Sequence, residues 1–174
     1  MEGNLLIIGA GTYAQVAAEI AADMGVFLQM AFVDDKAKTL LDGTPVVGTT
    51  QDIDRLAGEY SAIIVAIGNP KVRLSLLEKI KEKFPDRIIS LISPRAYVSP
   101  TAKIMPGCII EPMAVVQSNA TIGDGTMIAS GAVIKHNAVV GNGCYVDCNS
   151  TVLAGAIVPN GEKVFANTVV EGRK

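Results

Sequence analysis

The sequence predicts an α/β Rossmann-like N-terminal domain followed by a left-handed parallel β-helix of hexapeptide repeats. Three observations predict this fold. Strand-like and helix-like segments alternate in the first half of the chain, a glycine turn follows the first apolar segment, and an isoleucine or valine recurs at every sixth position of the second half. We expect the first domain to span residues 1–93 and the second to span residues 94–174.

The first half of the chain alternates between the two regular elements. The expected strands are 5–8, 32–33, 62–67 and 87–92, and the expected helices are 13–24 and 71–84. Gly25 follows the first helix, as is typical of a helix end. Strands that alternate with helices predict a parallel sheet, whose ligand site lies at the carboxyl ends of the strands.

Three loops are therefore expected to meet at one edge of this sheet and to bind substrate. They contribute Gly9, Gly11, Thr12 and Tyr13, then Asp34 and Asp35, and then Gly68 and Asn69. Backbone N–H groups at a glycine turn and helix N-terminus suit a diphosphate, and an acid after the second strand suits a ribose or base. The glycines could alternatively serve only tight packing, and the two acids only a solvated turn. Ala14 breaks the G-x-G-x-x-G fingerprint, so nicotinamide binding is only partly supported.

The second half carries the repeat. The aliphatic series is Val98, Ile104, Ile110, Val116, Ile122, Ile128, Ile134, Val140, Val146, Val152, Val158, Val164 and Val170. A mostly small residue follows each member four positions later, and glycine, proline and asparagine fill the remaining positions. Neither the helical nor the strand period gives a six-residue step, whereas a triangular coil with three short sides does. An ordinary sandwich would not hold this register for so many consecutive steps.

His136 is the only histidine of the chain, and it lies two residues after the repeat position Ile134. This register places it at a corner or flank of its coil rather than in the apolar centre. A neutral imidazole can take a proton from a hydroxyl or amine as that group attacks a thioester. The alternative is a surface histidine without a role.

Composition excludes several classes of protein. The net charge of −2, with 18% charged residues, provides no basic field for nucleic acid. The three cysteines, Cys108, Cys144 and Cys148, lack paired metal-ligand spacing, so we expect neither a disulfide framework nor a metal site. No apolar run approaches the roughly 18 residues of a membrane helix. We therefore expect a cytoplasmic protein that binds no membrane.

The chain resembles the hexapeptide-repeat sugar O- and N-acetyltransferases, which include sialic acid O-acetyltransferases and the acetyltransferases of bacillosamine-type UDP-amino-sugar synthesis. The resemblance extends over nearly the whole chain. It is carried by Ile7-Ile8-Gly9-Ala10-Gly11, Phe32-Val33-Asp34-Asp35, Ala66-Ile67-Gly68-Asn69, Leu91-Ile92, Val98-Ser99-Pro100-Thr101-Ala102 and Gly131-Ala132-Val133-Ile134-Lys135-His136-Asn137. It implies a homotrimer with acetyl-CoA in the groove between adjacent β-helices and a UDP-linked sugar on the N-terminal domain.

The resemblance also implies the roles of individual residues. His136 would be the general base, and Asn137 stands where the family commonly has an acid, which Asp147 could supply instead. Tyr145 falls on a position that contacts the acetyl-CoA thioester region in relatives, although it could also only pack against its flank.

Further acetyl-CoA contacts are expected near the end of the chain. Ala154 and Gly155, one coil after His136, could offer a backbone N–H to the oxyanion, and Ala166 would be the last contact. Relatives usually continue through further coils, so the donor site is expected to be abbreviated.

The sequence supports three functional hypotheses to different degrees. The leading hypothesis is direct transfer of an acetyl group from acetyl-CoA to an amino or hydroxyl group of a nucleotide-linked or related sugar. The alternative is a catalytically weak or silent nucleotide-sugar-binding trimer, which Asn137, Tyr13 and the short C-terminus favour. The third hypothesis, a nicotinamide-dependent reductase, does not account for the hexapeptide repeat.

Overall fold

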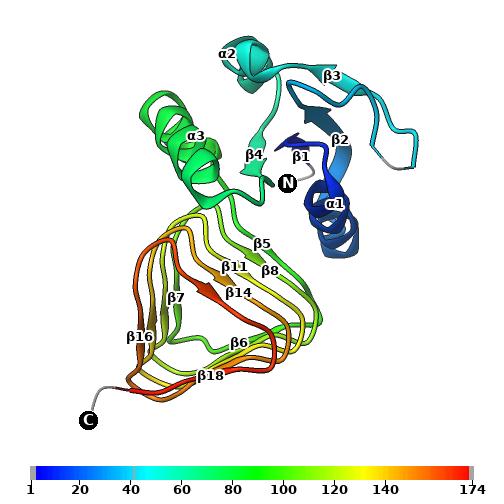
Figure 1. The fold of residues 1–174 in the computed structure, drawn as a ribbon. Helices are drawn as coiled ribbons and strands as arrows, with labels where there is room; N and C mark the ends of the chain where they lie inside the picture. The colour runs from blue at the N-terminus through cyan, green and yellow to red at the C-terminus, as the bar shows by residue number, and fades with distance from the viewer. Residues whose placement is uncertain (1–2, 41, 173–174) are drawn as a thin grey trace. The chain divides into compact units, whose positions relative to one another are not determined.

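A computed structural model describes residues 3–40 and 42–172 of the chain (Figure 1). The chain divides between Ile89 and Ser90 into two units, where the sequence suggested a boundary after residue 93. No helix within the described residues is long and apolar enough to cross a membrane.

The first unit is built on a four-stranded parallel sheet with the strand order β3-β2-β1-β4. Its strands are β1 (Gly3–Ile8), β2 (Phe27–Val33), β3 (Val46–Gly48) and β4 (Ala62–Val65), and its helices are α1 (Thr12–Met24), α2 (Ile53–Ala57) and α3 (Pro70–Lys83). Two short 3-10 helices, η1 (Thr50–Asp52) and η2 (Pro85–Arg87), complete it. Successive strands are added to one edge of the sheet from β1 to β3, and β4 is then added to the other side of β1. Open α/β sheets bind ligands at such a reversal of strand order, here between β1 and β4.

Helices cover both faces of this sheet, with α1 on one side and α2 and α3 on the other (Figure 1). Strand alternation sends Leu6 and Ile8 of β1 into the cluster that α2 and α3 complete. Buried alanines, including Ala14 and Ala17, line α1 and allow it to approach the sheet closely. Because both faces of the sheet are covered at β1, its side chains are buried in both directions, which explains the continuous apolar run of this strand.

The sequence-based prediction for the end of this unit was wrong in one respect. Residues 87–92 do not form a strand of this sheet, and β3 occupies the fourth place instead. Arg87 ends η2, Ile88 makes only an isolated bridge to Ile63, and Leu91–Ile92 is β5, the first strand of the second unit. Ile92 lies one six-residue step before Val98, so the repeat begins earlier than the series read from the sequence.

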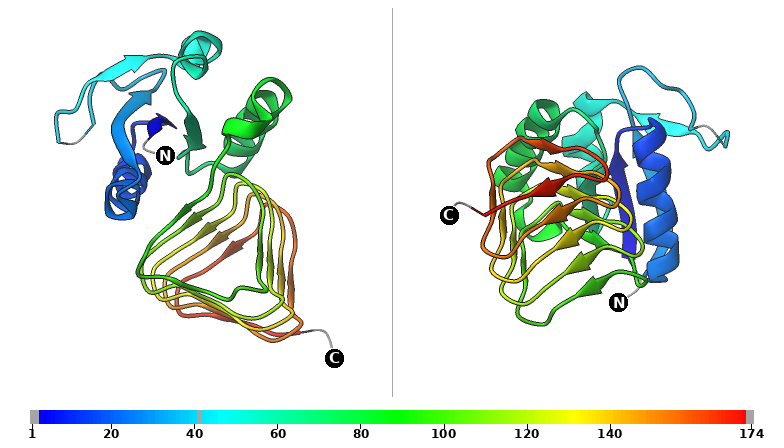
Figure 2. Two further views of the ribbon diagram at one scale, coloured as in Figure 1. Left: turned by 180° about the vertical axis from the view of Figure 1, so that it is seen from behind. Right: turned by 60° about the horizontal axis from the view of Figure 1, so that its bottom comes forward.

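The second unit is the predicted β-helix, a stack of triangular coils (Figure 2). Its two-residue strands are β5 (Leu91–Ile92), β6 (Tyr97–Val98), β7 (Lys103–Ile104), β8 (Ile109–Ile110), β9 (Val115–Val116), β10 (Thr121–Ile122), β11 (Met127–Ile128), β12 (Val133–Ile134), β13 (Val139–Val140), β14 (Tyr145–Val146), β15 (Thr151–Val152), β16 (Ile157–Val158), β17 (Lys163–Val164) and β18 (Val169–Val170). They form three parallel sheets, β5-β8-β11-β14-β17, β6-β9-β12-β15-β18 and β7-β10-β13-β16. Ile122 is paired with Val140, so one coil takes eighteen residues.

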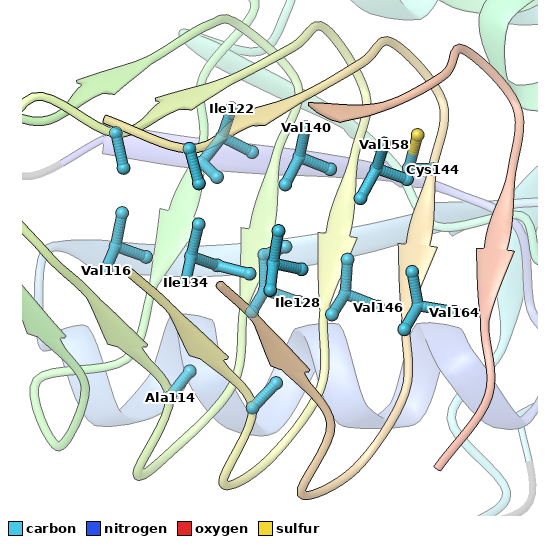
Figure 3. Packing of buried hydrophobic residues seen from close by; sticks show 14 of the residues in the cluster. Ala114, Val116, Ile122, Ile128, Ile134, Val140, Cys144, Val146, Val158 and Val164 are labelled. Atoms are coloured by element: carbon cyan, nitrogen blue, oxygen red, sulfur yellow. The ribbon is translucent and has the colours of Figure 1, made fainter. Parts of the chain in front are cut away.

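The aliphatic series forms the core of this unit. Ile122, Val140 and Val158 stack in one column, and Ile128, Val146 and Val164 stack in another (Figure 3). Small residues such as Ala132 and Ala138 are fully buried beside the turns. β-Branched side chains suit these short parallel strands because their restricted rotamers stack in register.

From Gly107 onward, each corner turn of the described residues is closed by a residue in the left-handed conformation. The three stacks of such residues are Gly107, Gly125, Gly143 and Gly161; Asn119, Asn137 and Gly155; and Met113, Gly131, Asn149 and Asn167. Glycine and asparagine adopt this conformation at the lowest cost, which explains their recurrence between the aliphatic positions.

One corner also depends on asparagine side chains that bond to the coil before them. The Oδ1 atoms of Asn142 and Asn160 accept hydrogen bonds from the backbone N–H groups of Asp124 and Asn142, at 2.9 and 2.8 Å. Gly141 leaves room for this contact, since a Cβ there would lie 2.5 Å from Oδ1 of Asn160 and 2.7 Å from its backbone nitrogen.

We therefore expect Gly141→Ala to destabilise the β-helix, by about 1–3 kcal/mol, because the added methyl group overpacks the corner. Thermal unfolding of the purified variant measures the effect. Gly68→Ala is the matched control, because no atom lies within 4 Å of its added Cβ. Equal unfolding temperatures for the two variants would contradict this account of the corner.

Candidate active site

His136 lies in the turn between β12 and β13, at the corner that we call the histidine corner. This corner consists of residues 99–102, 117–120, 135–138 and 153–156, which stack from coil to coil. The side chain of His136 is exposed, as the repeat register predicted. Its carbonyl oxygen accepts a hydrogen bond from the N–H of Gly155 at 3.2 Å, which fixes the next coil directly over it.

The residue after the histidine is determined by the backbone of the corner. Asn137 has a φ of 59°, and Asn119 and Gly155 occupy the same left-handed position in the adjacent coils. An asparagine at this position therefore has a structural cause in addition to any catalytic one.

The side chain of Asn137 also contacts the imidazole. Its Nδ2 lies 3.2 Å from Nδ1 of His136, while Oε1 of Gln117 accepts the backbone N–H of His136 at 3.2 Å. With Nδ2 toward the ring, the amide donates to Nδ1 and the ring proton sits on Nε2. With the amide turned over, Oδ1 accepts the Nδ1 proton and leaves Nε2 as a proton acceptor.

Asp147, the other candidate acid, does not lie at the histidine corner. It belongs to the corner formed by residues 147–150, where its carboxylate pairs with Nζ of Lys163 at 3.2 Å and accepts the N–H of Cys148 at 2.8 Å. Burial alone would raise the pKa of Asp147, but these two contacts hold it below its usual value. Within one chain, this carboxylate is occupied elsewhere.

The turn above His136 offers one free backbone donor. The N–H of Gly155 is used by the carbonyl of His136 and so is unavailable to a ligand. The N–H of Ala154, eighteen residues after His136, has no hydrogen-bond partner within residues 3–40 and 42–172. Of the two residues expected to stabilise an oxyanion, Ala154 has the available group.

Tyr145 and Ala166 lie away from the histidine corner in the single chain. Tyr145 faces outward from the sheet that contains β14, and Ala166 belongs to the corner formed by residues 165–168. Burial, followed by the nearby charge of Asp147, raises the pKa of Tyr145 to about 12. Nζ of Lys163 lies 5.3 Å from the centroid of its ring. The structure thus groups Ala154 and Gly155 with His136 and separates the other two predicted contacts.

In the first unit, Asp34 ties two of the predicted substrate loops together. Its Oδ2 accepts the N–H of Ala10 at 2.9 Å, and its Oδ1 accepts those of Lys36 and Ala37. Burial would raise the pKa of Asp34, but these backbone N–H groups hold it below its usual value. Its ionised carboxylate shapes the glycine turn from within.

Two further polar candidates also bond to the chain itself. Oδ1 of Asn69 caps α3 by accepting the N–H groups of Lys71 and Val72, at 3.0 and 3.2 Å. Asp35 accepts the N–H and the hydroxyl of Thr50, at 2.8 and 2.9 Å. These side chains position their loops, and Asp35 also lines a surface pocket of about 370 Å³ beside α3.

Several backbone N–H groups of these loops remain available to a ligand. Those of Gly11, Thr12, Gly68 and Asn69 have no hydrogen-bond partner in the described part of the chain. Gly11 and Thr12 begin α1 at the end of β1, and Gly68 and Asn69 follow β4, the strand beside β1. Tyr13, the remaining predicted residue of the turn, is half-buried in α1. This arrangement of N–H groups suits an anion such as a diphosphate.

Sequence reasoning missed Arg73, which supports one of these loops. Arg73 is fully buried in α3, and its guanidinium donates to the carbonyl oxygens of Ile67 and Gly68 at 2.7 and 2.9 Å. Its position four residues before Leu77 and seven before Ile80, on the buried face of the helix, was the available signal.

The described residues include no group of three or more histidine, cysteine or acidic side chains that could hold a metal. Cys108, Cys144 and Cys148 are free thiols. The thiols of Cys108 and Cys144 donate to the corner carbonyls of Gly123 and Pro159. Their role at the small repeat positions is therefore packing.

Two protein families match the sequence. Residues 4–80 match the PglD N-terminal domain, and residues 101–136 match the bacterial transferase hexapeptide family of six repeats. A search of the curated proteins found no match.

Solved acetyltransferases share the whole architecture. The acetyltransferase domain of PglB from Neisseria gonorrhoeae FA1090 is 29% identical, with a TM-score of 0.83 over 97% of this chain and 91% of that chain. The same domain in complex with acetyl coenzyme A is 28% identical, with a TM-score of 0.73 over 99% of this chain and 100% of that chain. A mutant of perosamine N-acetyltransferase from Caulobacter crescentus, in complex with CoA and GDP-perosamine, is 26% identical, with a TM-score of 0.62 over 96% of this chain and 90% of that chain.

Gly9 and Gly11 should respond differently to the same substitution. Gly9 has a φ of 115°, and a Cβ there would lie 2.9 Å from the carbonyl oxygen of Ala66, whereas Gly11 has a φ of −81° and nothing within 4 Å. We expect Gly9→Ala to cost more than about 1 kcal/mol of stability and Gly11→Ala to change it by less than about 0.5 kcal/mol. Denaturant unfolding followed by circular dichroism measures both. Equal losses would show that the two glycines share one structural role.

Proposed function

We propose a substrate and a mechanism for this chain, which is a hexapeptide-repeat sugar acetyltransferase with a PglD-type N-terminal domain and acetyl-CoA as its cosubstrate. It transfers an acetyl group to an amino or hydroxyl group of a nucleotide-linked sugar. The observation that carries the mechanism is the stacking of an exposed His136 beneath the free N–H of Ala154.

In the proposed reaction the amide of Asn137 is turned so that its Oδ1 accepts the Nδ1 proton of His136, and the unprotonated Nε2 accepts the proton of the attacking amine or hydroxyl. The new C–N or C–O bond forms at the thioester carbonyl, whose oxygen becomes negative and accepts the N–H of Ala154. Collapse of this intermediate breaks the C–S bond, and the imidazolium returns its proton to the leaving thiolate. Transfer is direct, because Cys108 and Cys144 are buried packing residues and no covalent enzyme intermediate is needed.

The nucleotide-linked sugar is assigned to the first unit. The free N–H groups of Gly11, Thr12, Gly68 and Asn69 suit its diphosphate, and the polar side chains of Asp34 and Asn69 hold the loops that present them. The structures of perosamine N-acetyltransferase with GDP-perosamine favour a nucleotide sugar over a free sugar. UDP-linked and GDP-linked amino sugars are therefore the first substrates to test.

The active form is proposed to be a homotrimer. The two sheets beside the histidine corner carry exposed apolar residues, including Tyr97, Val139, Ile157 and Val169. Burial between copies would remove this surface from water. A neighbouring copy could also bring its Tyr145 and Ala166 to the acetyl-CoA that His136 serves. The free thiols are consistent with a cytoplasmic enzyme.

The catalytically silent alternative loses one of its supports. The left-handed backbone of the corner accounts for Asn137, so an asparagine there does not by itself indicate lost activity. The unusual Tyr13 in the glycine turn still favours this alternative.

His136→Ala should lower kcat by about 10²- to 10⁴-fold, as expected for the loss of a general base, while the unfolding temperature stays unchanged because the side chain is exposed. Release of the CoA thiol measures turnover, and calorimetry with acetyl-CoA and with a UDP- or GDP-linked amino sugar measures binding. Retained turnover would reject the assignment of the base. A wild-type protein that binds the nucleotide sugar but not acetyl-CoA would instead support the silent trimer.

Asn137→Asp should move the acidic limb of the pH–rate profile to higher pH. A carboxylate beside Nδ1 stabilises the imidazolium, so the ring remains protonated, and inactive as a base, up to a higher pH. Above that limb the more basic imidazole should turn over faster than wild type.

The matched control is Asn119→Asp, which places the same charge at the same left-handed position one coil earlier. Thiol release measured across pH compares the three proteins. A shift of equal size in both variants would mean that the effect comes from charge on the corner in general, not from contact with the ring.

A further inference from the structure

We propose that Arg73 is a positioning residue for the nucleotide sugar, acting through the Gly68–Asn69 loop that it holds in place. The proposal rests on the function proposed above. Arg73 has 0% exposure and lies in the first turn of α3, which begins directly after Asn69. A buried guanidinium is costly unless its donors are satisfied, so its place in the core requires specific acceptors.

Two of those acceptors belong to the loop itself. One guanidinium nitrogen donates to the carbonyl oxygens of both Ile67 and Gly68, at 2.7 and 2.9 Å. The backbone N–H of Arg73 donates to the carbonyl of Asn69 at 2.9 Å. Three consecutive carbonyl groups of the loop thus turn toward the same residue of α3.

This arrangement determines where the N–H groups of the loop point. In a trans peptide the C=O and N–H bonds point in opposite directions. The carbonyl of Ile67 shares its peptide with the N–H of Gly68, and the carbonyl of Gly68 shares its peptide with the N–H of Asn69. Both N–H groups therefore point away from the guanidinium, and neither has a partner within the part of the chain that the structure describes.

The surroundings of the loop leave open space beside Gly68. Gly68 needs no glycine for its own fold, because its φ is not left-handed and no atom lies within 4 Å of an added Cβ. Oδ1 of Asn69 is committed to capping α3, so the donors that Asn69 can offer a ligand are its backbone N–H and its side-chain Nδ2. Two outward N–H groups with a positive charge behind them suit the diphosphate of a nucleotide sugar.

Arg87 provides a matched control in the same unit. Its guanidinium also donates to two carbonyls, those of Ala57 and Tyr60, and it lies over the ring of Phe84, 5.6 Å from the centroid. None of these contacts involves a predicted substrate loop. Arg87→Met therefore removes a comparable set of bonds without touching the Gly68–Asn69 loop.

The test compares Arg73→Met, Arg73→Lys and Arg87→Met in the full-length protein, with GDP- and UDP-linked amino sugars as substrates. For Arg73→Met we expect the KM for the nucleotide sugar to rise about tenfold or more, with the KM for acetyl-CoA and kcat within about twofold of wild type. Arg73→Lys keeps the charge and one donor nitrogen, so its KM for the nucleotide sugar should lie between the values of wild type and Arg73→Met. Arg87→Met should lower the unfolding temperature and leave both KM values unchanged.

An unchanged KM for the nucleotide sugar in a folded Arg73→Met protein would overturn the proposal, as would equal changes in both KM values and kcat. If Arg73→Met does not fold, Arg73→Lys decides the question by the same comparison of KM values. A wild-type protein that turns over neither nucleotide sugar would refute the proposed function and this inference together, whereas normal wild-type activity with an unaffected Arg73 variant refutes the inference alone.

Discussion

The structure of the second unit depends on one constraint, the turning of the chain through a corner every six residues without losing the stack. From Gly107 onward each turn contains a residue in the left-handed conformation, and each short side carries an aliphatic residue that lies over its counterpart eighteen residues away. When both conditions hold, a residue at one corner is fixed relative to the residue one coil later. This is how His136 comes to lie beneath Ala154 without any special contact between their side chains.

The same constraint limits which chemistry the corner can offer. The position after His136 must accept a left-handed backbone, which favours asparagine, glycine or aspartate over glutamate. In this chain the asparagine meets the requirement of the backbone and also reaches Nδ1 of the imidazole. Ring orientation and corner geometry therefore depend on one residue, so a substitution there changes the contact with the ring and the stability of the corner together unless the replacement also tolerates the left-handed region.

Much of the fold could be predicted from the sequence, because a six-residue step between aliphatic residues has only one common structural solution. The register of this repeat also placed His136 at a corner. The errors arose where two patterns overlapped. Ile92 ends an apolar segment that has the pattern of a strand of the first sheet. It also lies six residues before Val98, in register with the hexapeptide repeat, and in the structure it belongs to the β-helix. The loops proposed to bind substrate follow the strands β1, β2 and β4, but the side chains of Asp34 and Asn69 in them bond to the chain's own backbone. The sequence does not reveal whether a loop side chain faces its own backbone or a ligand, and Arg73 was missed because its acceptors are carbonyls.

The glycines show how the structure separates fold from function where the sequence does not. Gly9 is required by its φ of 115° and by the carbonyl of Ala66, and Gly141 by the neighbouring Asn160, so the fold accounts for both. Gly11 and Gly68 have neither cause, since space is open around them and their backbones suit other residues. A glycine in open space allows a ligand to approach the backbone closely, and Gly11 also serves as the N-cap of α1. Both glycines lie beside free N–H groups, at the ends of the adjacent strands β1 and β4, as the proposed binding of an anionic ligand requires.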